Sequence, residues 1–210
     1  YSFTPTKRKC LSFLESKIAQ GLFLSTLHTN MSSFIKIIAP ILLSVLTLNA
    51  GVYEDLEYGD TKQEVTDKLM ACNRVENTVP KTMFGRVGLN GTFRIKKALN
   101  GVNFSIFFDW NEHDKLKEIS LRSDAIDQAK YSSTLRELFK KANRLITEIY
   151  GPAIMANPMP KNTQIGDGTI LNSHLWHIGE GTLLMGIAKE HGNLHLSISF
   201  LEKRIEPIRN

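Results

Sequence analysis

The amino-acid sequence predicts an α+β fold, with helices packed on one face of an antiparallel sheet. Asn90-Gly91 and Asn100-Gly101 are both signals for tight hairpins. Two helical patterns each precede a run of strand patterns, and the absence of strand-helix-strand alternation disfavours a parallel sheet. We therefore expect one domain over residues 51–210, built from two tandem helix-plus-meander units at about 59–122 and 131–201.

The first helix is predicted to begin near residue 60. Asp60 can cap it with Gln63 three residues on, and Thr61 with Glu64 offers the same capping box one residue later. The apolar stripe that follows has helical spacing and consists of Val65, Leu69 and Cys72.

After Pro80 the pattern changes to period two, which predicts a four-stranded meander. The expected strands are 82–89, 92–99, 102–110 and 115–122. The third has the clearest alternation, with one apolar face formed by Val102, Phe104, Ile106, Phe108 and Trp110. Its opposite face carries Asn103, Ser105, Phe107 and Asp109. One face of this meander is therefore expected to be buried.

The second unit is predicted to begin near Ser132 with a helix capped by Thr134 and Glu137. Its stripe comprises Leu135, Leu138, Phe139, Ala142, Leu145, Ile146, Ile149 and Tyr150. Gly151 and Pro152 are expected to end it. A loop over 153–168 and strands over 169–178, 182–190 and 193–201 complete the unit.

The first fifty residues are typical of a targeting segment. Met31 and Lys36 precede a twelve-residue apolar run, 37–48, and Ala50 provides a small residue at its exit. We interpret 31–50 as a signal peptide cleaved after Ala50, which places the protein in the periplasm or outside the cell. Residues 1–30 are interpreted as a non-native upstream extension. The alternatives are an uncleaved anchor and a buried helix for 31–50, and a basic membrane-surface helix for 1–30.

Charge argues against a nucleic-acid partner. Residues 1–50 hold five of the 26 basic groups and one of the 21 acidic groups. Residues 51–210 therefore hold 21 basic and 20 acidic groups, a near balance that lacks a basic footprint. Cys72 is the single cysteine of that part, so an internal disulfide framework is not available to it.

One short motif resembles a known family. Gly59-Asp60-Thr61, followed by Glu64-Val65 and Leu69, is similar to the opening motif of the small outer-membrane-assembly lipoproteins (SmpA/OmlA-like). The tandem plan also resembles the β-lactamase inhibitor protein fold. The chain departs from the lipoproteins in the residues after Leu69 and in lacking their lipid-bearing cysteine. The resemblance implies a sheet face that is presented to another protein, without catalysis.

Candidate catalytic and metal-binding groups are dispersed. The histidines of the last strands are His174, His177, His191 and His195. His174 and His177 are an odd number of residues apart and so face opposite sides of a strand. We expect these histidines to lie at the surface and Cys72 to pack as a small apolar group. No metal, nucleotide or other cofactor is expected. Asp109 and Glu112 are interpreted as a solvated turn rather than a calcium site.

The remaining candidates are apolar side chains outside the expected core: Phe107, Ile154, Met155 and Met159. Phe107 either lies under a neighbouring element or forms part of a binding patch. We expect an exported, non-enzymatic protein that binds another envelope or extracellular protein through its sheet face or the 153–168 loop. The alternative is a carrier of a small apolar ligand, which requires a cavity lined by Phe104, Phe108, Leu138 and Leu145. A hydrolase is a third hypothesis.

Overall fold

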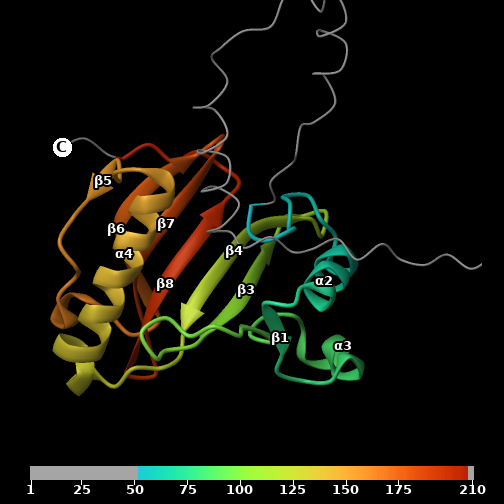
Figure 1. Cartoon of the computed structure of the whole chain (residues 1–210), viewed down its shortest axis with the longest axis horizontal. Coiled ribbons are helices and arrows are strands. Elements are labelled where there is room, and N and C mark those ends of the chain that lie inside the picture. Colours follow the sequence, from blue (N-terminus) through green and yellow to red (C-terminus); the bar gives the residue numbers. More distant parts are fainter. Residues whose placement is uncertain (1–51, 208–210) are drawn as a thin grey trace, which may run out of the picture.

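A computed structural model describes residues 52–207 (Figure 1). Eight strands form a single antiparallel sheet in the order β1-β2-β3-β4-β8-β7-β6-β5, and helices accompany it. The predicted α+β class is confirmed. The expected signal peptide, 31–50, and the segment before it, 1–30, lie outside the described residues.

The strands differ greatly in length. They are β1 (Val75–Asn77), β2 (Phe93–Ile95), β3 (Phe104–Trp110), β4 (Leu116–Ser123), β5 (Met155–Ala156), β6 (Thr169–Ile178), β7 (Gly181–Glu190) and β8 (Asn193–Leu201). The α-helices are α2 (Lys62–Ala71), α3 (Phe84–Val87) and α4 (Arg136–Tyr150). Single turns of other helix types are η1 (Lys81–Met83), η2 (Gln128–Lys130), η3 (Tyr131–Leu135) and η4 (Asn162–Gln164). The longest strands therefore lie in the half that contains α4.

Helix α2 begins with the second of the two predicted capping boxes. Thr61 Oγ1 accepts from the Glu64 N–H at 3.2 Å, and the Glu64 carboxylate accepts from the Thr61 N–H at 2.7 Å. The Asp60 carboxylate accepts instead from the Glu57 N–H and from Lys68 Nζ, at 2.8 and 2.7 Å. Because these contacts engage its carboxylate oxygens, Asp60 does not cap the helix as the first predicted box requires. It orders the segment that leads into the helix instead.

The expected strand at 82–89 is wrong, because this segment forms η1 and α3. Phe84 is buried against Phe93, with the two ring centroids 5.3 Å apart, and Gly88 ends the helix with a φ of 75°. The strand expected at 92–99 is reduced to β2. Packing of Phe84 in the core thus overrides the alternating pattern of the sequence.

The two Asn-Gly pairs behave differently. At Asn100-Gly101 both residues have positive φ, 53° and 77°, and the turn joins Leu99 to Val102 as a tight hairpin. Asn90-Gly91 instead leads from α3 into β2, and its Asn90 side chain accepts from the Phe108 N–H at 2.7 Å. Asn90 therefore anchors β3 instead of forming the predicted hairpin turn.

The second half follows its prediction more closely. Strands β6, β7 and β8 match their expected bounds to within one residue, and Gly151 ends α4 with a φ of 83°. The capping box predicted at Thr134 and Glu137 is absent from α4. Thr134 lies within the π-type turn η3, which runs directly into α4, so it does not occupy the N-cap position. The predicted 153–168 loop contains β5 and η4.

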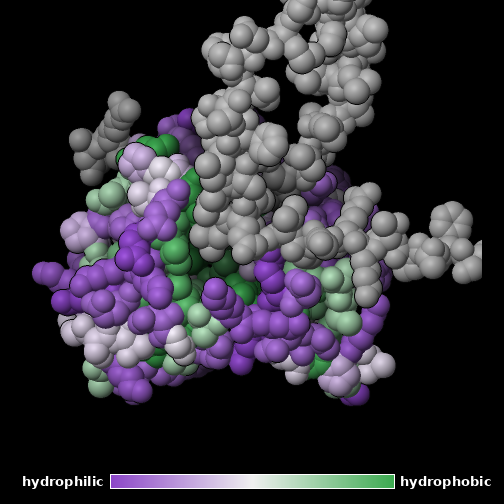
Figure 2. Space-filling view, in the orientation of Figure 1, coloured by the Kyte–Doolittle hydropathy of each residue, from purple (hydrophilic) through white to green (hydrophobic). Residues whose placement is uncertain are grey.

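The apolar core lies against the sheet face that carries the even-numbered residues of β3. Its members include Ile106, Ile119, Met185, Leu196, Ile198 and Phe200 from the strands and Val65, Leu69, Leu138, Phe139 and Ile146 from α2 and α4. Figure 1 shows α4 lying across the β6 half and α2 at the other end of the sheet. In Figure 2, hydrophilic side chains cover the outside of α4, and apolar side chains appear in the gap between α4 and the α2 half.

Candidate functional site

The sheet face opposite the core, here called the outer face, is defined by strand register. Paired residues form a row across the sheet, in the order Phe107, Ser120, Ser199, Leu184, Leu175 and Met155. The positions from Phe107 to Leu175 alternate with core residues on their strands, as Phe107 does with Ile106 and Phe108, whereas Met155 lies between the exposed Ile154 and Ala156. The middle of the row is polar, since the Ser120 and Ser199 hydroxyls are hydrogen-bonded at 2.6 Å.

The four predicted partner-binding residues do not form one patch. Phe107 and Met155 share the outer face but stand at opposite ends of the row, about 24 Å apart at the usual strand spacing. Ile154, which is 50% exposed, precedes Met155 and so points to the opposite face. Met159 packs against the core. Part of the predicted loop forms strand β5, in which successive side chains point to opposite faces of the sheet. Ile154 and Met155 are therefore separated.

Phe107 is half-buried on the outer face. The Arg122 guanidinium lies over its ring, 4.7 Å from the centroid, which is the geometry of a cation–π contact. The Gly91 turn also approaches the ring edge, since a Cβ at Gly91 would stand 3.6 Å from Phe107 Cζ. Phe107 therefore lies partly under its neighbours and still contributes to the surface.

A second row lies next to the first and carries two arginines. Its members, in register order, are Arg94, Ser105, Arg122, Ser197 and Gly186. Sequence reasoning missed this row. The alternation predicted for residues 102–110 places Ser105 on the polar face, but the pairing of β4 with β8 has no local signal in the sequence.

Both arginines of the second row have carboxylate partners. Arg122 Nη1 donates to Glu190 at 3.0 Å, and Arg94 Nη2 donates to Asp124 at 3.3 Å. Asn103 also donates to Asp124, at 3.0 Å. These contacts hold the two guanidinium groups against the sheet.

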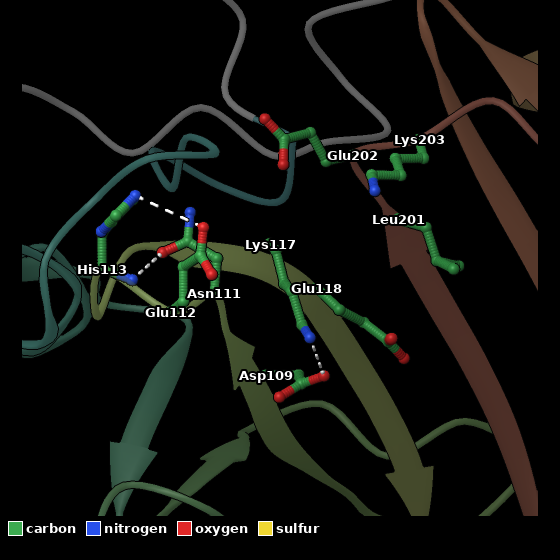
Figure 3. A pocket seen from close by; sticks show the side chains of 9 residues that line it. All are labelled: Asp109, Asn111, Glu112, His113, Lys117, Glu118, Leu201, Glu202 and Lys203. Atoms are coloured by element: carbon green, nitrogen blue, oxygen red, sulfur yellow. Dashed lines mark hydrogen bonds and ion pairs between the residues drawn. The ribbon is translucent and has the colours of Figure 1, made fainter.

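A pocket of about 560 Å³ continues the outer face at the β3–β4 turn (Figure 3). It is lined by Asp109, Asn111, Glu112, His113, Lys117, Glu118, Leu201, Glu202 and Lys203. Asp109 forms an ion pair with Lys117 at 2.9 Å, and Glu118 accepts from the Ser120 hydroxyl at 2.8 Å. The pocket is thus a mixed-charge depression whose carboxylates Asp109 and Glu118 are engaged by neighbours.

The histidines do not converge. His174 is paired with Met185 on the core face, whereas His177 is paired with Thr182 on the outer face and donates to the Ile205 carbonyl at 2.9 Å. His191 lies in the β7–β8 turn, and His195 donates to the Ser123 carbonyl at 2.8 Å. Within residues 52–207, no three metal-ligating side chains are grouped as a cation would require.

His174 corrects the expectation that these histidines lie at the surface. It is 6% exposed and stacks on Trp176, with Phe139 of α4 edge-on to its ring. Its Nδ1 lies 3.0 Å from Ser173 Oγ, but both residues are buried, so this Ser–His contact is inaccessible to a substrate. Burial lowers the pKa of His174 because it penalises the charged imidazolium.

This lowered pKa predicts acid-sensitive stability. The unfolded chain takes up a proton at His174 near the ordinary value of 6.5, before the folded protein does. We therefore expect the Tm to fall as the pH decreases from about 7.5 to about 5.5, and His174→Phe to flatten that decline. Thermal melts over this range test it. His113→Gln, at an exposed histidine, is the control and should leave the wild-type slope; equal slopes for wild type and His174→Phe would contradict the prediction.

Cys72 is buried, as predicted, and its Sγ lies 3.8 Å from Glu54 Oε2. The residues expected to line a carrier cavity are divided between β3, which holds Phe104 and Phe108, and α4, which holds Leu138 and Leu145. Among residues 52–207, no helix has the length and apolarity needed to cross a bilayer.

Comparison with known proteins identifies no relative: no family model, no curated protein and no solved structure matches this chain. The geometry of the outer face therefore carries the functional argument.

Proposed function

We propose that the protein is a non-enzymatic binding protein that docks another protein on its outer face. The observation that carries this proposal is the stacked pair of Phe107 and Arg122 beside the hydrogen-bonded Ser120 and Ser199. Aromatic and arginine side chains held in place by neighbours are the residue types that dominate the energetics of protein interfaces. Small hydroxyl side chains beside them let a partner approach the sheet closely.

The outer face is favoured over the 153–168 loop. Met155 contributes to the outer face from β5, and the partly buried Met159 packs against the core. Of the three apolar candidates in the loop, Ile154 is therefore the one left for a loop-mediated contact. The carrier and hydrolase hypotheses have less support, because Phe104, Phe108 and Leu138 of the expected cavity lining belong to the packed apolar core, and the pocket carboxylates Asp109 and Glu118 are engaged by Lys117 and Ser120.

We also propose that the chain comprises two units of one plan, with helices on a single sheet face. Strands β1–β4 and β5–β8 occupy the sheet in mirrored order and meet at β4 and β8, the last strand of each half. Residues of α2 and α4 belong to the same apolar cluster, which supports a common covered face. This plan is the one implied by the resemblance to the β-lactamase inhibitor protein fold.

Export remains a proposal that rests on the sequence. The charged start, apolar run and small exit residue within 31–50 support cleavage after Ala50 and a periplasmic or extracellular location. The intact mass of the protein recovered outside the cytoplasm tests cleavage, and a species that retains residues 31–50 would contradict it.

Capture from the protein's own cell envelope or medium tests the docking proposal. We expect a photo-crosslinker at Ser120 to capture a partner, and Phe107→Ala to reduce capture by at least about tenfold, as at an interface hot spot. Val87→Ala removes an exposed apolar side chain from α3 and is the matched control. Equal capture by both variants, or capture that depends on Val87 instead, would contradict the proposal.

A further inference from the structure

Asparagine or aspartate stands directly before glycine at three places in the sequence: Asn90-Gly91, Asn100-Gly101 and Asp167-Gly168. Such pairs are chemically reactive, because glycine has no side chain to shield its backbone nitrogen. That nitrogen can attack the side-chain carbonyl carbon of the preceding residue and close a cyclic imide, a succinimide. The attack needs a glycine N–H and a side chain that are both free of other bonds.

At Asn90-Gly91 both reacting groups are held by hydrogen bonds. The Gly91 N–H donates to the Ile106 carbonyl at 2.9 Å, and the Asn90 side-chain oxygen accepts from the Phe108 N–H at 2.7 Å. Attack at this pair therefore requires two hydrogen bonds to β3 to break. The contacts that keep Asn90 out of a hairpin turn thus also protect it from reaction.

Asp167-Gly168 is held in the same way. The Gly168 N–H donates to the Lys189 carbonyl at 2.8 Å, and the Asp167 carboxylate accepts from the Gly192 N–H at 3.0 Å. Closure of the imide at this pair, which would release water, therefore also requires two hydrogen bonds to break.

Asn100-Gly101 has neither kind of contact. Among the described residues, the Asn100 side chain and the Gly101 N–H have no hydrogen-bond partner, and both residues are exposed. The turn is closed by two hydrogen bonds between Leu99 and Val102, at 3.0 and 2.9 Å, and this pair is an isolated bridge outside the named strands. Local opening of so short a pairing costs little free energy, so the Gly101 nitrogen can approach the Asn100 amide.

We infer that Asn100 is a site of spontaneous deamidation, whereas Asn90 and Asp167 are protected by the fold. The Gly101 nitrogen loses its proton to solvent base and bonds to Asn100 Cγ. The Cγ–Nδ2 bond breaks, and this nitrogen takes up a proton and leaves as ammonia. Water then opens the imide at either carbonyl and yields isoaspartate or aspartate, with no atom oxidised or reduced. This inference goes beyond the proposed function and does not depend on it.

The modification changes the turn that leads into β3. Either product adds a negative charge, and isoaspartate also inserts an extra carbon into the main chain of a two-residue turn whose positions need positive φ. We expect the bridge between Leu99 and Val102 to be lost in the isoaspartate form. Strand β3 should keep its pairing with β4, which begins beyond the turn at Phe104.

Peptide mapping of the full chain by mass spectrometry tests the inference, after incubation in mildly alkaline buffer well below the Tm. We expect the Asn100 peptide to gain the mass difference between an –NH₂ and an –OH group, with isoaspartate among the products. The Asn90 peptide should react at least about tenfold more slowly, which corresponds to a barrier about 1.4 kcal/mol higher. The Asp167 peptide should remain free of isoaspartate. In denaturant the rates at Asn100 and Asn90 should converge, because the unfolded chain lacks the hydrogen bonds that protect Asn90.

A variant identifies the reacting residue. Asn100→Gly keeps a residue suited to positive φ in the turn and removes the side-chain amide, so it should abolish the fast reaction. A fast reaction that persists in this variant would place the modification elsewhere and overturn the inference.

Three outcomes with the wild-type chain would also overturn the inference. Equal rates at Asn100 and Asn90 in the folded protein would mean that the fold does not protect Asn90. An Asn100 peptide that reacts in denaturant and stays unchanged in the folded protein would mean that the turn prevents the attack. Aspartate as the sole product at Asn100 would reject the imide route, since direct hydrolysis of the amide does not form isoaspartate.

Discussion

Phe108→Ala is expected to lower the free energy of unfolding by about 3–5 kcal/mol, the usual cost of deleting a buried phenylalanine side chain. Phe108 is 4% exposed and lies on the core face of β3. Its ring packs beside Trp110, with centroids 6.0 Å apart, and its backbone N–H is held by the Asn90 side chain. Removal of the ring leaves a cavity that this fixed strand cannot close, so most of the cost should persist after relaxation.

The neighbouring residue provides a matched control. Phe107→Ala removes the same side chain from the same strand, but from the outer face, where the ring is half-buried. We expect this variant to lose less than half as much stability while it loses partner capture. Denaturant unfolding of both variants gives the comparison. Equal losses of stability in the two variants would mean that Phe107 is buried as fully as Phe108, which contradicts the structure.

The second large effect is expected at Gly186, where any side chain meets backbone. A Cβ there would stand 2.4 Å from the Leu171 carbonyl oxygen and 2.7 Å from Asn172 Cα. The pairing of β6 with β7 shifts between Asn172 and His174, and this irregularity brings the β6 backbone over Gly186. Gly186→Ala must therefore displace a strand, and we expect it to cost at least about 1–3 kcal/mol, as overpacking does.

Gly85→Ala is the control for this substitution. Gly85 lies in α3, and a Cβ there would have nothing within 4 Å. We expect it to be neutral or to stabilise the protein by up to about 1 kcal/mol, because alanine favours a helix. Thermal or denaturant unfolding measures both variants. A stable Gly186→Ala protein with unchanged β6 amide signals would contradict the predicted clash. A destabilised one should also weaken binding on the outer face, since Gly186 is paired with Ser197.

The sequence alone determined those elements whose signals are local. Two short turn signals, at 179–181 and at 191–192, divide residues 169–201, and residues 194–200 alternate, so the three strands there are predictable to within one residue. The stripe of α4 and its Gly151 end were likewise predictable, because helix periodicity and a positive-φ glycine are properties of neighbouring residues. Asn100-Gly101 formed its hairpin for the same reason.

Tertiary contacts decided the other elements. Residues 82–89 have a strand-like pattern, but Phe84 gains more by packing on Phe93 from a helix. Asn90 does not form the predicted hairpin turn, because its side chain accepts a hydrogen bond from the Phe108 N–H. In each case a contact with a residue outside the local segment outweighs a local preference of small magnitude.

The candidate site also combines features that local sequence predicts with features that tertiary contacts decide. Alternation along residues 102–110 identified Phe107 as facing away from the core, which the structure bears out. Its placement beside Arg122, and that of Arg122 beside Ser197, follows from the registers of β3 with β4 and of β4 with β8. The β4–β8 register joins strands more than 70 residues apart. It depends on how the shared core packs, because a shift by one residue would move every outer-face side chain into the core. The sequence therefore determined which side chains face away from the core, and the tertiary structure decided which of them meet.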